Sequence, residues 1–224
     1  MTLERGFTVT QFIYLHGFAS GPGSKKASVF KKRFDQIPAP LTIPDLQGED
    51  FRQMTLSTQI KGVTDCMDRY PGQRFGLIGS SMGGYVAALT AQFRTDVAAM
   101  YLMAPGFNFL KRWRERLSSD PSDPRAVPSV IRVFHYRYNR TMELDAGIFQ
   151  DAERWEKLSL NRELPTRVVH GLRDETVDIA ESRKFAQDHP WCRLKELDAP
   201  HDLISHLDWI VADCLEFFHE EDLF

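Results

Sequence analysis

The sequence predicts an α/β protein with a mostly parallel sheet of about six to seven strands and helices on both faces. Short apolar runs alternate with longer amphipathic segments over most of the chain, which is typical of parallel strands joined by crossover helices. The chain has 224 residues, 42% of them hydrophobic and 26% charged. We therefore expect one domain, residues 1–224, with a sizeable core.

Six apolar runs are expected to form strands, and five amphipathic segments are expected to form helices. The strands are predicted at residues 11–15, 41–44, 74–78, 97–103, 166–170 and 193–197. The helices are predicted at residues 24–35, 55–70, 82–93, 175–187 and 203–217. Ser24 is expected to cap the first helix, and Pro71-Gly72 is expected to end the second. The third helix is rich in glycine and alanine, so it can lie close to a sheet.

The alternation is interrupted between residues 105 and 165. This stretch has an aromatic-basic run at residues 133–138 and a helix-like segment at residues 145–158. We expect residues 106–164 to form a helical cap over the carboxyl edge of the sheet. Residues 111–140 include eight Lys/Arg and three Asp/Glu, so 8 − 3 gives a local balance of +5. That charge indicates either a solvated helix surface or a rim that attracts an anionic substrate.

The motif Gly79-Ser80-Ser81-Met82-Gly83 lies between a predicted strand and a predicted helix. In a G-x-S-x-G pattern the serine occupies a sharp turn that exposes its hydroxyl beside a helix N-terminus. Ser80 is an alternative nucleophile, but only Ser81 has glycine two residues before and two residues after it. Ser81 is therefore the candidate nucleophile.

A serine nucleophile needs a base, and the base needs an orienting acid, in the chain order Ser, Asp/Glu, His. Asp174 follows the predicted strand at residues 166–170, and His201 follows the strand at residues 193–197. The carboxyl ends of parallel strands are where open α/β sheets place their chemistry. We therefore assign His201 as general base and acid, and Asp174 as the orienting carboxylate.

Other acids and histidines are weaker candidates. Asp178 could replace Asp174 if the loop is longer than expected, whereas Asp202 adjoins His201 and is poorly placed to orient its ring. His206 falls within the next predicted helix. The remaining alternatives, expected to be ordinary surface or cap histidines, are His135, His189 and His219.

A tetrahedral intermediate needs two hydrogen-bond donors for its oxygen. The backbone N–H of Met82, directly after the nucleophile, is the first candidate. The second is the N–H of Phe18, in the glycine-rich loop at residues 16–23. This loop could also be a plain turn, but it has neither of the phosphate-binding patterns G-x-x-x-x-G-K-[ST] and G-x-G-x-x-G.

The composition limits which partners, location and cysteine chemistry we expect. The net charge of −3 and the shortness of the basic stretch argue against a nucleic-acid partner. No apolar stretch approaches the roughly 20 residues of a membrane helix, and residues 1–10 have no signal-type apolar region, so we expect a cytoplasmic protein. Its three cysteines are widely spaced, which favours reduced thiols over disulfides, a zinc site or an activated nucleophile.

Four segments together resemble the α/β-hydrolase superfamily: YLHGF at 14–18, GSSMGG at 79–84, HGLRDETVD at 170–178 and APHDL at 199–203. More narrowly, HGFASGPGSKKA at 16–27 resembles the small YqiA-type esterases and related thioester hydrolases. The likeness extends from about residue 10 to residue 217. It implies an eight-stranded sheet, here without the first hairpin, and no cofactor or metal. The chain departs from the pattern at Asp178, where many members have proline, and at Pro200, where glycine is commoner.

The motifs and the resemblance together predict a serine hydrolase that cleaves a small-molecule carboxylic ester or thioester. The acyl length, the leaving group, the oligomeric state and an anionic character of the substrate are left open. Six of the aromatic residues of the insertion could form an acyl pocket or simply pack: Phe107, Phe109, Trp113, Phe134, Tyr136 and Tyr138. The alternative function is a ligand-binding protein that keeps the pocket without turnover.

Overall fold

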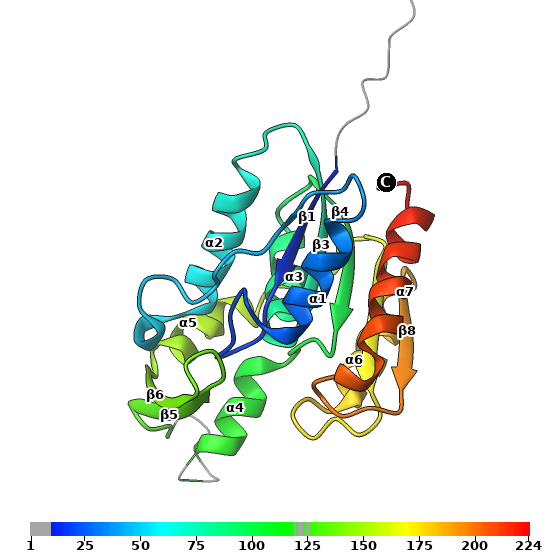
Figure 1. Ribbon diagram of the computed structural model, residues 1–224. Helices are drawn as coiled ribbons and strands as arrows, with labels where there is room; N and C mark the ends of the chain where they lie inside the picture. The colour runs from blue at the N-terminus through cyan, green and yellow to red at the C-terminus, as the bar shows by residue number, and fades with distance from the viewer. Residues whose placement is uncertain (1–9, 119, 121–122, 124–125) are drawn as a thin grey trace, which may run out of the picture.

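The computed structural model describes residues 10–118, 120, 123 and 126–224 (Figure 1). Residues 1–9, and residues 119, 121–122 and 124–125 of the insertion, lie outside the described residues. The main sheet, in the part of the chain described, has six strands. They are β1 (Thr10–Leu15), β2 (Leu41–Thr42), β3 (Arg74–Ser80), β4 (Val97–Met103), β7 (Thr166–Gly171) and β8 (Cys192–Leu197).

The strand order is β2-β1-β3-β4-β7-β8, and every neighbouring pair is parallel. All residues of β1 and β7 are buried, as expected for strands covered on both faces. The predicted α/β class and all six predicted strands are confirmed, with boundaries that differ by two residues or fewer. The arrows of the main sheet in Figure 1 point toward the end of the molecule where the insertion lies, so the loops after these strands gather there.

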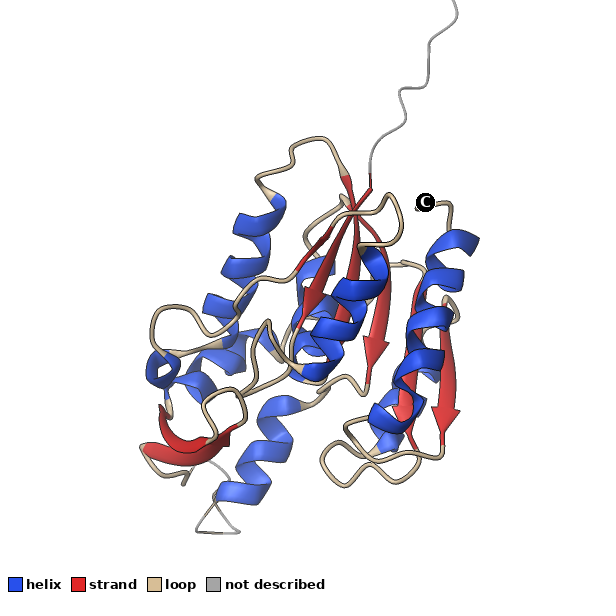
Figure 2. Ribbon diagram, viewed as in Figure 1, coloured by secondary structure: helices blue, strands red, loops and turns tan. Residues whose placement is uncertain are grey.

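Helices form a layer on each face of the sheet (Figure 2). One layer consists of α1 (Lys25–Phe34) and α7 (Leu207–Glu220), and the other of α2 (Leu56–Met67), α3 (Met82–Ala91) and α6 (Ile179–Asp188). Two separate apolar clusters fill the spaces between these layers and the sheet. Helix α3 is buried at every position. Its glycine and alanine residues let it lie directly on the central strands.

The helix ends follow from local side-chain chemistry. The Ala27 N–H donates to the Ser24 hydroxyl at 3.3 Å, so Ser24 caps α1 as expected. Thr55 and Thr58 form a capping box at the start of α2. The helix predicted at residues 203–217 begins instead as a short 3₁₀ turn, η2 (Ile204–His206), that leads into α7.

The insertion is only partly helical. It contains α4 (Phe109–Leu117) and α5 (Gly147–Trp155), but between them lies an antiparallel hairpin of β5 (Val130–His135) and β6 (Arg140–Asp145). The expectation of a helical cap is therefore wrong for this segment. β-Branched and aromatic residues dominate β5, which favours a strand. The turn between the two strands places Asn139 at φ 49°, a conformation that asparagine tolerates.

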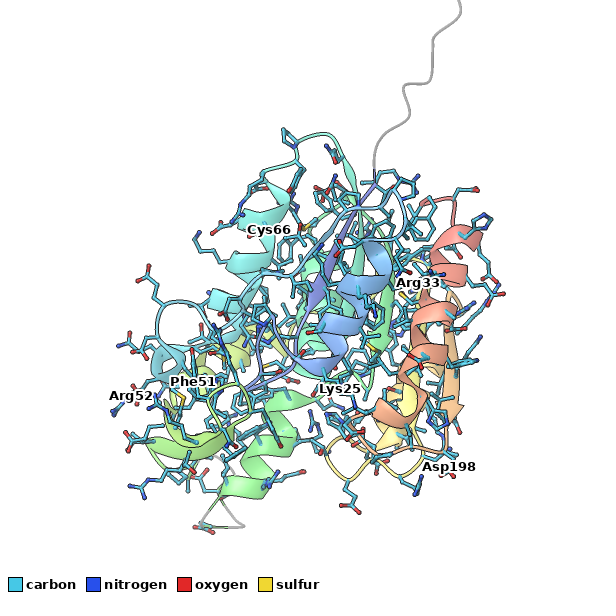
Figure 3. All side chains as sticks on the ribbon, in the orientation of Figure 1. Lys25, Arg33, Phe51, Arg52, Cys66 and Asp198 are labelled. Carbon is cyan, nitrogen blue, oxygen red and sulfur yellow. The ribbon has the colours of Figure 1, made fainter. Side chains whose placement is uncertain are left out.

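The hairpin is fixed to the rest of the molecule through η1 (Phe51–Gln53). Arg52 donates to Glu143 at 3.0 Å and to Asp145 at 2.9 Å, and the Phe51 ring lies 4.7 Å from the His135 ring. Figure 3 labels Phe51 and Arg52 beside the hairpin. These contacts hold the insertion at the carboxyl edge of the sheet.

Candidate active site

Ser81 occupies a tight turn between β3 and α3. Its φ of 53° and ψ of −119° are rare for a residue with a side chain. Although it is the N-cap residue of α3, its hydroxyl makes no capping hydrogen bond. A Cβ added to Gly83 would lie 2.1 Å from the Leu15 carbonyl oxygen, so only glycine lets the turn approach β1 this closely. The turn therefore leaves the Ser81 hydroxyl available to other side chains.

The structure brings the three candidate side chains together from three separate loops. The His201 Nε2 lies 3.0 Å from the Ser81 Oγ, and the His201 Nδ1 lies 2.6 Å from the Asp174 Oδ2. With Nδ1–H donating to the carboxylate, Nε2 is free to accept the serine proton. A hydroxyl, an imidazole and a carboxylate are thus in line, which is the geometry of a serine triad.

The Asp174 carboxylate is fully buried and held at both oxygens. Its Oδ1 accepts from the N–H groups of Thr176 and Val177, each at 2.8 Å. Burial alone would raise the pKa of this carboxyl. Hydrogen bonds from His170, His201 and the Val177 N–H outweigh burial and hold the pKa of Asp174 well below its usual range. The carboxylate is therefore ionised beside His201.

The alternative acids accept hydrogen bonds from nearby backbone N–H groups. The Asp178 Oδ1 accepts from the Ala180 N–H at 2.8 Å and caps α6, and the Asp202 Oδ1 accepts from the Ile204 N–H at 3.0 Å. The predicted helix at residues 175–187 begins only at Ile179, because residues 174–178 form the loop that positions Asp174. Ser80 is buried at the end of β3, and His206 lies in η2.

Both expected oxyanion donors lie beside Ser81. The Met82 N–H opens α3, where the helix dipole favours negative charge. Phe18 directly follows Gly17, where an added Cβ would lie 3.4 Å from the Ser81 Cβ. Within the described residues, neither N–H donates to a protein acceptor. Both donors are thus free to bind a developing oxyanion.

Several histidines differ from expectation. His135 and His189 are buried rather than on the surface, His135 against Phe51 and His189 against Phe185. No role for His170 is evident from the sequence, yet its ring is fully buried and its Nε2 lies 3.0 Å from the Asp174 Oδ2. Its spacing of four residues from the candidate acid, in His170-Gly171-x-x-Asp174, does not distinguish a contact with that acid from simple packing.

The insertion contacts the loops that carry the site. Arg112 of α4 donates from Nε to the Phe107 carbonyl at 2.9 Å and from Nη1 to the Thr176 carbonyl at 3.1 Å, so it joins the loop after β4 to the loop of Asp174. Arg114 pairs with Glu153, and Arg137 pairs with Asp45. Part of the positive charge of the insertion is therefore used within the protein.

The six aromatic residues expected to form a pocket or to pack divide into two groups. Phe107 and Phe109 are buried, and Trp113, which is half-buried, lies 5.0 Å from the Phe18 ring. Phe134, Tyr136 and Tyr138 are exposed on the hairpin. A cavity of about 170 Å³ is lined by Tyr85, Phe107 and Phe185 among others, but by none of the three candidate side chains. Of these six residues, Trp113 is the one whose ring packs against the ring of Phe18.

The three cysteines are unsuited to nucleophilic chemistry. All are buried, and burial raises the pKa of the Cys192 thiol to about 12 and that of Cys214 well above its usual value. The described residues contain no group of three His, Cys, Asp or Glu side chains placed to hold a metal ion. Among the helices described, none is long and apolar enough to cross a membrane.

The fold matches solved α/β-hydrolase structures over nearly all of the chain. Est1E from Butyrivibrio proteoclasticus with ferulic acid bound has 18% identity and a TM-score of 0.81, covering 96% of this chain and 90% of that one. Alpha/beta hydrolase domain-containing protein 10 from mouse has 17% identity and a TM-score of 0.80, covering 94% and 90%. A structure from a study of LipS and LipT, two metagenome-derived lipolytic enzymes, has 14% identity and a TM-score of 0.74, covering 95% and 94%.

At these identities the solved structures show the fold alone, which is the predicted α/β-hydrolase fold. A search of curated proteins found no match. The sequence itself matches one family, described as Uncharacterised protein family UPF0227, over residues 11–215. Since this match covers almost the whole chain, the protein belongs to the UPF0227 family and has the α/β-hydrolase fold.

Proposed function

We propose that the protein is a serine hydrolase that cleaves a small-molecule carboxylic ester or thioester through an acyl-enzyme on Ser81. The observation that carries this proposal is the line of contacts from Ser81 Oγ to His201 at 3.0 Å and from His201 to Asp174 at 2.6 Å. A buried, ionised carboxylate beside an imidazole that reaches a strained serine is the arrangement that acyl transfer requires.

In acylation, His201 Nε2 accepts the Ser81 proton while Oγ forms a bond to the substrate carbonyl carbon. The carbonyl oxygen becomes an oxyanion, to which the N–H groups of Met82 and Phe18 donate. Asp174 stabilises the resulting imidazolium. When the tetrahedral intermediate collapses, the bond to the alcohol or thiol breaks, and His201 donates its proton to that leaving group.

In deacylation, His201 accepts a proton from water as the water oxygen attacks the acyl-enzyme carbonyl. The bond to Ser81 Oγ then breaks, His201 returns the proton to Oγ, and the carboxylic acid leaves. The same donors stabilise the second oxyanion. No group outside these five residues is needed for the proton transfers.

Two further observations favour an acyl substrate. Trp113 of the insertion packs against Phe18, so an apolar surface borders the loop that carries the second oxyanion donor. Among proteins of the same fold, LipS and LipT are lipolytic enzymes and Est1E binds ferulic acid, a carboxylic acid. A positive balance on the insertion favours an anionic ester over a cationic one.

The proposal is tested by hydrolysis of short p-nitrophenyl esters and of an acyl thioester. Wild type should hydrolyse at least one of them, and Ser81→Ala should lose activity by about 10⁴-fold or more. Ser80→Ala is the matched control, because Ser80 is adjacent in sequence but has its side chain buried in the fold. If Ser81→Ala keeps wild-type activity, Ser81 is not the nucleophile. If wild type hydrolyses no ester or thioester, a binding role without turnover replaces the proposal.

A further inference from the structure

We propose that His170 is a positioning residue that holds Asp174 Oδ2 toward His201. The inference rests on the proposed function, since it concerns the same carboxylate. His170 lies on β7, one residue before its end, and its side chain is fully buried. No substrate can reach it, so any effect on turnover must be indirect.

The His170 ring is fixed on both nitrogens. Its Nδ1 lies 2.7 Å from the Ser182 Oγ on α6. Its Nε2 lies 3.0 Å from the Asp174 Oδ2 and 3.0 Å from the Val177 carbonyl oxygen. A core histidine with a purely packing role needs neither contact with the candidate acid nor two polar neighbours at one nitrogen.

The partners determine the tautomer of the ring. Both neighbours of Nε2 are acceptors, a carboxylate and a carbonyl, so Nε2 must carry the hydrogen. In the neutral ring Nδ1 then accepts from the Ser182 hydroxyl. Ser182 therefore selects the tautomer with the hydrogen on Nε2, which donates to the Val177 carbonyl at 3.0 Å and faces the Asp174 Oδ2 at the same distance, much as Asp174 selects the tautomer of His201.

The two oxygens of Asp174 are held by different groups. Oδ1 is held by the N–H groups of Thr176 and Val177, whereas the partners of Oδ2 among the described residues are His170 and His201. Without His170, Oδ2 would keep only its contact with His201, the group that changes charge in the proposed reaction. His170 thus supplies a fixed contact that aims Oδ2 before His201 becomes charged.

Other charged groups near the pair come from three elements. Lys26 of α1 and Arg112 of α4 both act electrostatically on Asp174, and burial lowers the pKa of the Lys26 ammonium to about 8. Glu196 lies opposite His170 in the β7–β8 register, but it pairs with Arg183 at 2.7 Å. None of these side chains replaces the 3.0 Å contact of the His170 Nε2 with Oδ2.

The test compares His170→Leu, His170→Gln and Ser182→Ala in the full-length protein. The leucine variant removes the donor and keeps an apolar filler, whereas the glutamine variant can place an N–H group near the position of Nε2. His189→Leu is the control, because His189 is also a buried histidine beside α6 but bonds the Phe185 carbonyl, not Asp174. Thermal unfolding establishes that each variant is folded.

We expect His170→Leu to lower kcat about 10- to 100-fold with KM within twofold. The midpoint of the acidic limb of kcat/KM should move to higher pH, because Asp174 loses a donor and attracts the His201 imidazolium more strongly. His170→Gln should restore both quantities to near wild type, and Ser182→Ala should show a smaller shift in the same direction. A merely structural role would lower the amount of folded protein without moving the limb.

Titration of the His201 ring by NMR separates this inference from the proposed function, because it needs no turnover. A shifted titration midpoint of the His201 ring in His170→Leu supports the positioning role of His170 even if wild type hydrolyses no ester. If wild type is active but His170→Leu leaves the acidic limb of kcat/KM and the His201 ring titration unchanged, the positioning role of His170 is overturned. The proposal of a serine hydrolase then still stands. If His170→Leu does not fold, an unchanged limb in Ser182→Ala overturns it.

Discussion

The parallel sheet and the insertion between β4 and β7 differ in how their contacts relate to the sequence. The sheet is made of short buried strands whose neighbours are set by crossover helices, and the loops after β3, β7 and β8 bring Ser81, Asp174 and His201 together. The insertion is held by contacts between distant residues, such as Arg52 with Asp145 and Arg137 with Asp45.

This difference indicates a division of roles. The sheet edge holds every group that the proposed chemistry uses, whereas the insertion borders the site and contacts its loops through Arg112 and Trp113. Changes at the sheet edge should therefore lower kcat, and changes in the insertion should mainly alter KM.

The largest effect is expected for Asp174→Asn. An amide cannot stabilise the imidazolium and can favour the wrong tautomer of His201, so kcat should fall by about 10³- to 10⁴-fold. The measurement is kcat for the best ester or thioester. Asp178→Asn is the control in the same loop; it keeps a capping side chain on α6 and should stay within a few-fold of wild type. Equal losses in both variants would contradict the assignment of Asp174.

A second large effect is expected for Gly171→Ala. The added Cβ would lie 2.2 Å from the Ala199 carbonyl oxygen and 2.9 Å from the Pro200 oxygen. Since both are backbone atoms, the loops of Asp174 and His201 must move apart. The free energy of unfolding should fall by about 2–3 kcal/mol, measured by urea denaturation, and kcat should fall with it. Gly62→Ala, where an added Cβ meets nothing within 4 Å on α2, should instead be neutral or stabilising by up to about 1 kcal/mol. A fully active, stable Gly171→Ala would show that the two loops need no close approach.

The sheet and its loops were more predictable from the sequence than the insertion. The strand–turn–helix around Ser81, the acid after one strand and the histidine after the next were all predictable, because local patterns determine them. The hairpin of β5 and β6 was missed because its aromatic and basic residues also suit a helical surface, and because the contacts that stabilise it lie far away in the sequence. His135 was expected outside the core for the same reason, since the packing of Phe51 against it is not visible locally.

Two contacts of the site were also beyond sequence reasoning. His170 ends a buried strand, and nothing in the pattern distinguishes a ring that packs from one that donates to Asp174. Arg112 lies in a strongly basic stretch whose individual partners could not be assigned. In both cases the role depends on the geometry of one side chain rather than on composition or spacing.

A smaller effect is expected for the insertion variant Arg137→Ala, which breaks the contact with Asp45. Exposed ion pairs contribute only about 0–1 kcal/mol, so the melting temperature should change little. Because the hairpin also donates from the Tyr136 N–H to the Ala19 carbonyl at 2.9 Å, a looser hairpin should disturb the loop of Phe18 and raise KM a few-fold. Arg132→Ala on the same hairpin is the control. A loss confined to kcat would contradict the proposed division of roles.

The smallest effect concerns acid stability. The Gln47 N–H, which donates to the Asp45 Oδ1 at 3.1 Å, and the Arg137 guanidinium hold the pKa of the Asp45 carboxyl well below its usual range. Such a depressed pKa contributes stability that is present above the unfolded value of about 4 and is lost as the pH falls through the folded value. The urea midpoint should therefore drop between pH 5 and pH 3, and Asp45→Asn should drop less. Asp65→Asn, at an exposed carboxylate of α2, should follow wild type. An identical drop of the urea midpoint in all three proteins would show that Asp45 does not contribute to the loss of stability in acid.

The most direct test of the central claim is to react the protein with a fluorophosphonate and to map the adduct by mass spectrometry. The proposal predicts one phosphonate per chain on the Ser81 oxygen, with labelling abolished in Ser81→Ala and slowed in Asp174→Asn. An adduct on Ser80 or on another residue, or an active enzyme that never reacts, would contradict Ser81 as the nucleophile.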